Sequence, residues 1–294
     1  MPRLLLLSTV ATLMLGVGAV AEQKEPALPS GRDPGGIAIA LLGTGIDYTL
    51  PDIVRRLARD GEGELIGWDL VDNDNRPFRA SGRAAPASAL DSDSTPLARV
   101  TGATGRRLVP VKVDPANPVT FARAVAFVAQ TPARIVVVPM GSRQPSDWEP
   151  FRQAASHFRD LLFIVAAGDD DRDIDREPVW PAAFGLANAL VVSAHARPSA
   201  TAGGAPNAGA GTIDALVVLT EDAASAGGFP PRSSLAAILA ADALAGCWPR
   251  LVAAHRGEAL KRAVLAEVAK PGAGRAKPVI ERCTDDPAPA TLRR

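Results

Sequence analysis

The stretch Gly36-Ile-Ala-Ile-Ala-Leu-Leu-Gly43-Thr-Gly-Ile-Asp47 decides the fold. Its first seven residues are apolar or small with no polar alternation, which is typical of a strand buried on both faces of a parallel sheet. The glycines and the aspartate that follow are typical of the turn that ends such a strand. Five similar runs follow along the chain: Leu108–Val113, Arg134–Val138, Leu161–Ala166, Ala189–Ser193 and Ala215–Leu219.

Helical patterns lie between and after these runs. They cover Phe121–Ala129, Trp148–Phe158, Ser234–Ala245 and Glu258–Val268. The third pattern is apolar nearly all round and rich in alanine, which predicts a buried helix packed closely on the sheet. The alternation predicts an α/β fold with a doubly wound, mostly parallel sheet.

Ligands of such sheets bind beyond the carboxyl ends of the strands. We therefore expect any functional site among the residues that follow the predicted strands. These are Gly43–Asp47, Met140–Ser142, Gly168–Asp171 and Ser193–His195.

Composition excludes several classes of protein. The 294 residues include 32 Lys and Arg against 32 Asp and Glu, so the chain lacks the basic charge of a nucleic-acid-binding protein. Its 2 cysteines cannot form a four-thiolate zinc site, and we predict neither a metal nor another cofactor. Only 3 histidines are available as a general base.

The N-terminal residues are typical of a secretory signal peptide. Arg3 precedes the apolar run Leu4–Val20, and Ala19-Val-Ala21 has the small-x-small pattern of a cleavage site. The alternative is an uncleaved N-terminal anchor. Cleavage predicts a periplasmic or secreted protein with no membrane span.

The predicted organisation has four parts. Residues 1–21 form the signal peptide, 22–35 a linker, 36–269 the folded domain and 270–294 a proline-rich tail. Export to an oxidising compartment would allow Cys247 and Cys283 to form a disulfide, and the alternative is two unpaired buried thiols.

Several of the strand ends resemble motifs of the subtilisin-like serine peptidases. Gly43-Thr-Gly-Ile-Asp47 with Pro51-Asp-Ile53 is similar to the first motif of that family, an apolar run followed by Asp-Thr-Gly-Ile-Asp and a His-Pro-Asp-Leu-like segment. Further similar segments are Gly67–Asp74, Ile164–Asp170, Pro178–Ala182, Asn207–Asp214 and Ser233–Ala237. The resemblance runs in register from about residue 37 to about residue 268. It implies a subtilisin-like three-layer architecture and serine-type endopeptidase chemistry.

The catalytic positions depart from that family. The resemblance implies Asp, His and Ser in this order, with an Asn side chain in the oxyanion hole. Here Gly43 replaces the Asp, Asp93 replaces the His and Asp169 replaces the Asn, while Ser234 keeps the type of the nucleophile. Arg232 also replaces the Gly that precedes the family's Thr-Ser. A serine hydroxyl is a poor nucleophile without a base, and an ionised Asp169 would repel a developing oxyanion.

Other groups could replace the missing base. His195 follows a strand and is the histidine that we would test, whereas His157 and His255 are expected on helix surfaces or ends. The remaining route is activity at acid pH.

The sedolisins share the subtilisin fold and use Ser with Glu and Asp, with an Asp in the oxyanion hole. Asp93 and Asp169 superficially resemble that arrangement. Against it, sedolisins carry a Glu and an Asp on one helix turn, and the residue four after Asp93 is Leu97.

Some of these side chains also fit purely structural roles. Ser234 precedes the central helix and is typical of a helix N-cap. Asp47 and Asp52 fit turn and cap chemistry. The carboxylates of the run Asp169–Asp175 are spaced as at the start of a calcium-binding loop. An EF-hand needs Gly and Glu at two later positions, which are Ile174 and Trp180 here. Another calcium geometry stays open beside a solvated acidic loop.

The sequence therefore predicts an exported, catalytically inactive homologue of a subtilisin-like serine endopeptidase. Its old cleft would bind an extended peptide or a protein partner. Two alternatives remain, an active serine peptidase that uses Ser234 with a substitute or acid-pH base, and a structural or assembly partner.

Overall fold

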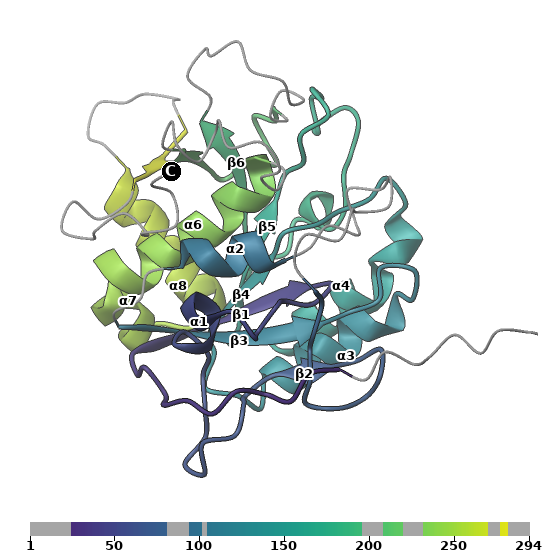
Figure 1. Cartoon of the computed structure of the whole chain (residues 1–294). Helices are drawn as coiled ribbons and strands as arrows, with labels where there is room; N and C mark the ends of the chain where they lie inside the picture. Colours follow the sequence, from purple (N-terminus) through teal and green to yellow (C-terminus); the bar gives the residue numbers. More distant parts are fainter. Residues whose placement is uncertain are drawn as a thin grey trace, which may run out of the picture.

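The computed structural model describes residues 25–80, 94–101, 105–195, 208–219, 232–269 and 277–281. An eight-stranded sheet with the order β2-β3-β1-β4-β5-β6-β7-β8 forms the centre of the molecule (Figure 1). All neighbouring strands pair in parallel. The strands are β1 (Ile37–Gly43), β2 (Trp68–Asp69), β3 (Arg106–Lys112), β4 (Ile135–Val138), β5 (Leu162–Ala166), β6 (Ala189–His195), β7 (Ala215–Val218) and β8 (Val279–Ile280).

Helices cover both faces of this sheet. They are α1 (Pro51–Val54), α2 (Thr95–Val100), α3 (Val119–Val128), α4 (Glu149–His157), α6 (Arg232–Cys247), α7 (Pro249–Ala254) and α8 (Gly257–Val268), with short 3₁₀ turns η2 (Pro145–Asp147) and η3 (Ala182–Phe184). In Figure 1, α6 and α8 lie on one side of the sheet, and α3 and α4 on the other. The predicted doubly wound parallel sheet is confirmed, and all six predicted strands are present.

Side chains of the central strands alternate between two cores. Ile39 and Leu41 of β1 pack towards α6, whereas Ala38, Ala40 and Leu42 pack towards α3 and α4. Because both faces are covered, each strand is apolar throughout, which explains the continuous runs in the sequence. The two cores together make a three-layer molecule.

Helix α6 is the most deeply buried helix in the described part of the chain. Every residue from Ser233 to Ala245 is buried. The small alanine side chains let the helix lie close to the strands, as predicted. One charged residue interrupts this surface: Asp242 forms an ion pair with Arg106 of β3, with 3.0 Å between Asp242 Oδ1 and Arg106 Nε.

The segment that precedes β1 is tied to the domain by polar contacts. The Tyr48 hydroxyl donates to the carbonyl of Pro26 at 2.8 Å. The carboxylate of Asp33 accepts from the main-chain N–H of Arg59 at 2.7 Å and from the Arg107 guanidinium at 3.0 Å. The part of the predicted linker that the structure describes therefore lies against the fold.

Several sequence predictions lie outside the described residues. The signal peptide, Asp93 and Cys283 are among them, so the Cys247–Cys283 disulfide stays a prediction. Within the predicted tail, residues 277–281 are described, and Val279–Ile280 pairs with β7 as an edge strand. None of the described helices combines the length and the apolar character needed to cross a membrane.

We predict that Arg106→Met destabilises the protein by about 3–5 kcal/mol, because it removes the guanidinium that pairs with the buried Asp242 carboxylate. The Arg106→Met/Asp242→Leu double variant should recover most of this loss, since it removes both charges. Urea unfolding of the three proteins measures the effect. A double variant that is as unstable as the single variant would contradict the prediction.

Candidate functional site

The carboxyl ends of β4 and β5 meet the N-terminus of α6, as expected for the functional edge of such a sheet. The Ser234 hydroxyl donates a hydrogen bond to the main-chain carbonyl of Pro139, directly after β4. The N–H of Gly168, just after β5, donates to Ser233 Oγ at 3.1 Å. Two adjacent serines thus join the helix to two neighbouring strand ends.

Ser234, the expected nucleophile, has no base beside it among the described residues. Its side chain is buried, with 5% exposed, and its only hydroxyl proton is directed at the Pro139 carbonyl. His157 lies exposed at the end of α4, His195 exposed at the end of β6, and His255 after α7, and none of the three hydrogen-bonds to Ser234. The hydroxyl serves here as a structural donor.

Asp169, at the expected oxyanion position, accepts hydrogen bonds from the start of α6. Its carboxylate oxygens accept from the Ser233 N–H at 3.0 and 2.9 Å, and one of them accepts from Ser233 Oγ at 2.6 Å. Burial raises the pKa of Asp169 from 3.8, and this outweighs the lowering by the Ser233 hydrogen bonds and the positive charge of Arg232. A carboxylate in this position binds the helix N-terminus, and when ionised it cannot donate to an oxyanion.

We predict that Asp169→Asn gains stability relative to the native protein as the pH rises. The folded protein holds the Asp169 proton more tightly than the unfolded chain, so the Asp169 contribution is largest at low pH and is lost as the pH rises from 3.8 through the raised pKa. An asparagine cannot ionise but still accepts the Ser233 N–H.

Urea unfolding at several pH values between about 3.5 and 7 measures this difference, with Asp171→Asn as the control. Asp171 is an exposed carboxylate nearby, and its positive φ of 56° is tolerated by asparagine. A stability difference between Asp169→Asn and the native protein that stays constant with pH would contradict the pKa shift.

Gly43 occupies the position expected for the triad aspartate. A neighbouring side chain fills the space that a side chain at position 43 would need. A Cβ at Gly43 would lie 2.1 Å from Ser94 Oγ and 2.9 Å from Ser94 Cβ. Ser94 is buried, accepts from the Thr44 N–H at 3.3 Å, and donates its own N–H to the carbonyl of Gly45 at 3.2 Å. The Ser94 side chain therefore occupies the place where an acidic side chain at position 43 would begin.

We predict that Gly43→Asp costs at least about 2 kcal/mol, because the new side chain collides with Ser94. Adding Ser94→Gly should recover much of this loss, so that the two changes couple by about 1–3 kcal/mol in a double-mutant cycle. Gly43→Asp combined with Ser156→Gly on the exposed face of α4 should be additive. Additivity of the 43/94 pair in thermal or urea unfolding would contradict the contact.

The two other aspartates near the first motif have structural roles. Asp47 Oδ1 accepts from the Thr49 N–H at 3.1 Å, which closes a turn after β1. The Asp52 carboxylate pairs with Arg99 at 2.8 Å and ties α1 to α2. The Asp47 contact is the turn expected for that residue, whereas Asp52 makes an ion pair between two helices and does not cap α1.

The acidic run that follows β5 does not converge on one point. Asp169 binds α6, Asp173 Oδ1 accepts the N–H of Asp175 at 3.1 Å, and Asp175 accepts from the N–H groups of Gly211 and Thr212 at 2.7 and 2.8 Å. A hydrogen bond from the Thr212 side chain, together with these N–H contacts, lowers the pKa of Asp175 to about 2. Within the described residues, these carboxylates are therefore not grouped as metal ligands.

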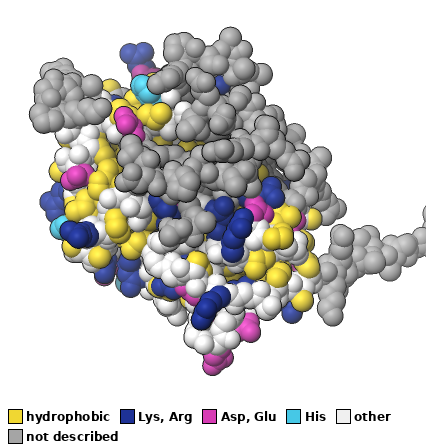
Figure 2. Space-filling view, turned by 60° about the vertical axis from the view of Figure 1, so that its left-hand side comes forward, with side chains coloured by type: hydrophobic (Ala, Val, Ile, Leu, Met, Phe, Trp, Pro, Cys, Tyr) yellow, Lys and Arg dark blue, Asp and Glu magenta, His cyan; other side chains and the backbone are white. Residues whose placement is uncertain are grey.

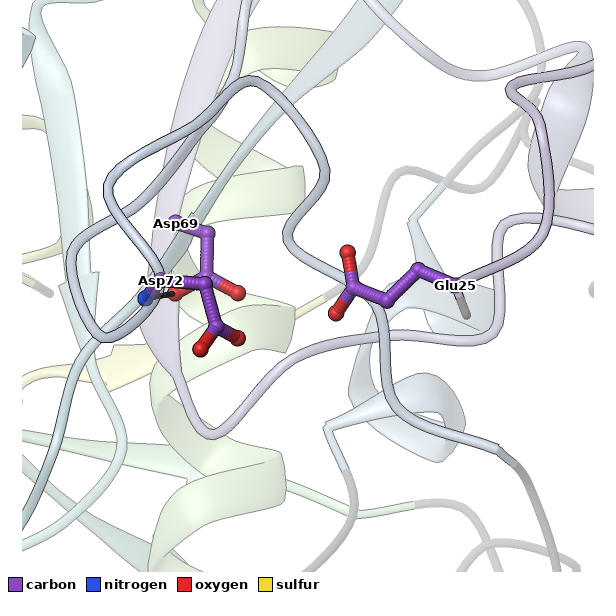
Figure 3. Close-up of side chains that lie close together, drawn as sticks. All are labelled: Glu25, Asp69 and Asp72. Carbon is purple, nitrogen blue, oxygen red and sulfur yellow. Dashed lines mark hydrogen bonds between the residues drawn. The ribbon is translucent and has the colours of Figure 1, made fainter. Parts of the chain in front are cut away.

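A different acidic cluster escaped the sequence reasoning. Glu25, Asp69 and Asp72 place carboxylate oxygens within 4.8 Å of one another (Figure 3). The Lys112 ammonium lies among them, at 2.6 Å from Asp69, 3.2 Å from Asp72 and 3.6 Å from Glu25. Burial would lower the pKa of Lys112, but its contacts with Asp69 and Asp72 outweigh this and raise it.

Lys112 thus supplies a cation to this cluster from within the chain. The lysine would have been recognisable only from the pairing of β2 with β3, which sets Asp69 beside Lys112. Because the ammonium occupies the centre, the cluster is a structural ion network that fastens the N-terminal segment to the edge of the sheet.

The segment Pro139–Ser142 after β4 pairs along one edge only, and the chain bends at Arg143. Ser142 exchanges two main-chain hydrogen bonds with Trp180, both of 2.9 Å. A Cβ at Gly141 would lie 2.6 Å from the Trp180 carbonyl oxygen, so glycine permits this close approach. In the described part of the chain, no hydrogen bond uses the main-chain groups of Gly141 or Arg143. Main-chain groups of neighbouring residues in a paired segment point to opposite sides, so the second edge at Gly141 is unpaired.

Comparison with known proteins identifies the fold. No family model and no curated protein matches the sequence. A lanthipeptide protease is similar with a TM-score of 0.55 and 15% identity, over 88% of this chain and 88% of that one. A cold-adapted subtilisin-like serine proteinase has a TM-score of 0.55 and 16% identity, over 87% and 92% of the two chains. The nisin leader peptidase NisP from Lactococcus lactis has a TM-score of 0.56 and 14% identity, over 85% and 87%.

These similarities extend over most of both chains, and the fold is therefore that of the subtilisin-like serine peptidases. The expectation drawn from the sequence motifs is confirmed at the level of the fold. Identities of 14–16% carry no information about activity.

Proposed function

We propose that this chain is an exported, catalytically inactive homologue of the subtilisin-like serine endopeptidases that binds extended peptides. The contact between Gly43 and Ser94 carries the first part of the proposal. A triad needs a carboxylate that orients the base, and the space for that carboxylate is filled by a serine side chain.

The remaining positions support the same conclusion. The sequence has Asp93 in place of the base, and Ser234 donates its proton to a main-chain carbonyl. Asp169 accepts hydrogen bonds where a peptidase needs a donor. In subtilisin itself, loss of the triad lowers kcat by about 10⁶. The fold supplies no evident compensation among its described residues.

The segment Pro139–Gln144 supports the peptide-binding part. Its unpaired edge lies next to the N-terminus of α6, and a peptide can add to such an edge as a further strand through main-chain hydrogen bonds. Two of the similar structures are named as a lanthipeptide protease and a leader peptidase, which is in keeping with a ligand that is a flexible polypeptide.

The test uses fluorescein-labelled casein as both substrate and ligand. We expect no hydrolysis that depends on Ser234 between pH 3 and 9, when the native protein is compared with Ser234→Ala. Ser234→Ala removes one buried hydrogen bond and should cost about 1 kcal/mol, so folding of the variant is checked by circular dichroism. Hydrolysis by the native protein that is lost in Ser234→Ala would overturn the proposal of inactivity.

Binding is measured with the same casein by fluorescence anisotropy. We expect saturable binding that Gly141→Ala weakens, because a Cβ there pushes the extended segment away from Trp180. Gly61→Ala is the matched control, since a Cβ at Gly61 has no atom within 4 Å. Absence of binding by the native protein, or equal loss in both variants, would refute peptide binding along this segment.

A further inference from the structure

We propose that Arg143 selects peptides with an acidic side chain at the position that lies opposite it. This inference rests on the proposed binding of peptides along Pro139–Gln144 and adds the chemistry of the ligand. Arg143 directly follows Ser142, and 62% of its side chain is exposed.

Arg143 reaches from the end of β4 to the end of β5. Its Nη2 lies 3.0 Å from Oδ2 of Asp170, which is 40% exposed. This is the single interaction of the Arg143 guanidinium in the described part of the chain. A guanidinium has five N–H donors, so most donors of Arg143 remain available for a second carboxylate.

Asp170 has much less remaining capacity. The same Oδ2 that faces Arg143 also accepts from Nε of Arg172, and Arg172 is held in turn by Glu177. A basic ligand would have to displace an arginine from Asp170. An acidic ligand can add to Arg143 and leave the existing ion pairs in place. The asymmetry favours acidic ligands.

The geometry of strand addition brings the ligand within reach. An added strand would pair with the unpaired main-chain groups of Gly141, and the chain bends at Arg143, directly after the residue that pairs with Trp180. Side chains directly opposite each other on paired antiparallel strands have Cβ atoms about 4.5–5.5 Å apart. A Glu or Asp of the added strand next to this bend lies within reach of the long, exposed Arg143 side chain, and the opposite charges attract.

The chain as a whole does not favour one charge, since it has 32 Lys and Arg against 32 Asp and Glu. Figure 2 shows Lys and Arg side chains interspersed with Asp, Glu and hydrophobic side chains on the face that it presents. Selectivity then depends on individual contacts and not on a broad field of one sign. Arg143 supplies this selectivity, because its guanidinium has available donors next to the unpaired edge.

Three fluorescein-labelled octapeptides test the inference. They consist of Ala and Ser and differ in one central residue, which is Glu, Gln or Lys. By fluorescence anisotropy, the native protein should bind the Glu peptide about two- to five-fold more tightly than the Gln peptide, and the Lys peptide least tightly. The preference should decrease between about 50 and 500 mM NaCl, because salt screens an exposed ion pair.

Variants assign the preference to one side chain. Arg143→Gln should remove the preference for Glu, and Asp170→Asn should increase it by releasing Arg143. Arg176→Gln is the matched control: Arg176 is 85% exposed, pairs with Asp173 on the neighbouring loop, and carries the same charge. That variant should retain the native preference.

The outcomes separate this inference from the proposed function. If casein binds saturably, three results overturn the role of Arg143 alone. These are equal affinity for the three peptides, no affinity for any of them, and a Glu preference that survives Arg143→Gln. Failure of casein itself to bind overturns the proposed peptide binding and this inference with it.

Discussion

The attachment of the α6 N-terminus to two strand ends is the contact around which the molecule is organised. A helix start leaves N–H groups without partners, and a start buried in the interior cannot use water to satisfy them. Asp169 supplies acceptors from the end of β5, while Ser234 donates to the end of β4. The alanine-rich helix can then lie along the sheet and complete one of its two cores.

The same attachment determines what this edge of the sheet can do. A negatively charged group is the favourable neighbour of a helix N-terminus, and it is also the group that an oxyanion site must exclude. Asp169 therefore satisfies the helix start through its oxygen acceptors, although burial disfavours its charge, and it leaves an acceptor where an oxyanion site would need a donor. The segment after β4 does not depend on Asp169, because it offers main-chain groups and not a reactive side chain.

Most of the scaffold could be predicted from the sequence, because burial on two faces leaves continuous apolar runs such as Ile37–Leu42. Strands β2 and β8 have two residues each and are too short to leave a pattern. The substitutions at Gly43 and Asp169 were visible from motif order alone. The contact of Ser94 with Gly43 was not, since it joins residues far apart in the chain. Lys112 was hidden in the same way, because only strand pairing sets it beside Asp69.

The packing of Ser94 against Gly43 also has an evolutionary consequence. A carboxylate at position 43 fits only after the side chain at position 94 has been removed, and removing that side chain first deletes a hydrogen-bond acceptor and leaves a void. Neither single step is favourable by itself, so the two positions form an epistatic pair with a barrier between its states. A carboxylate at position 43 is therefore reached only through a combined change at both positions.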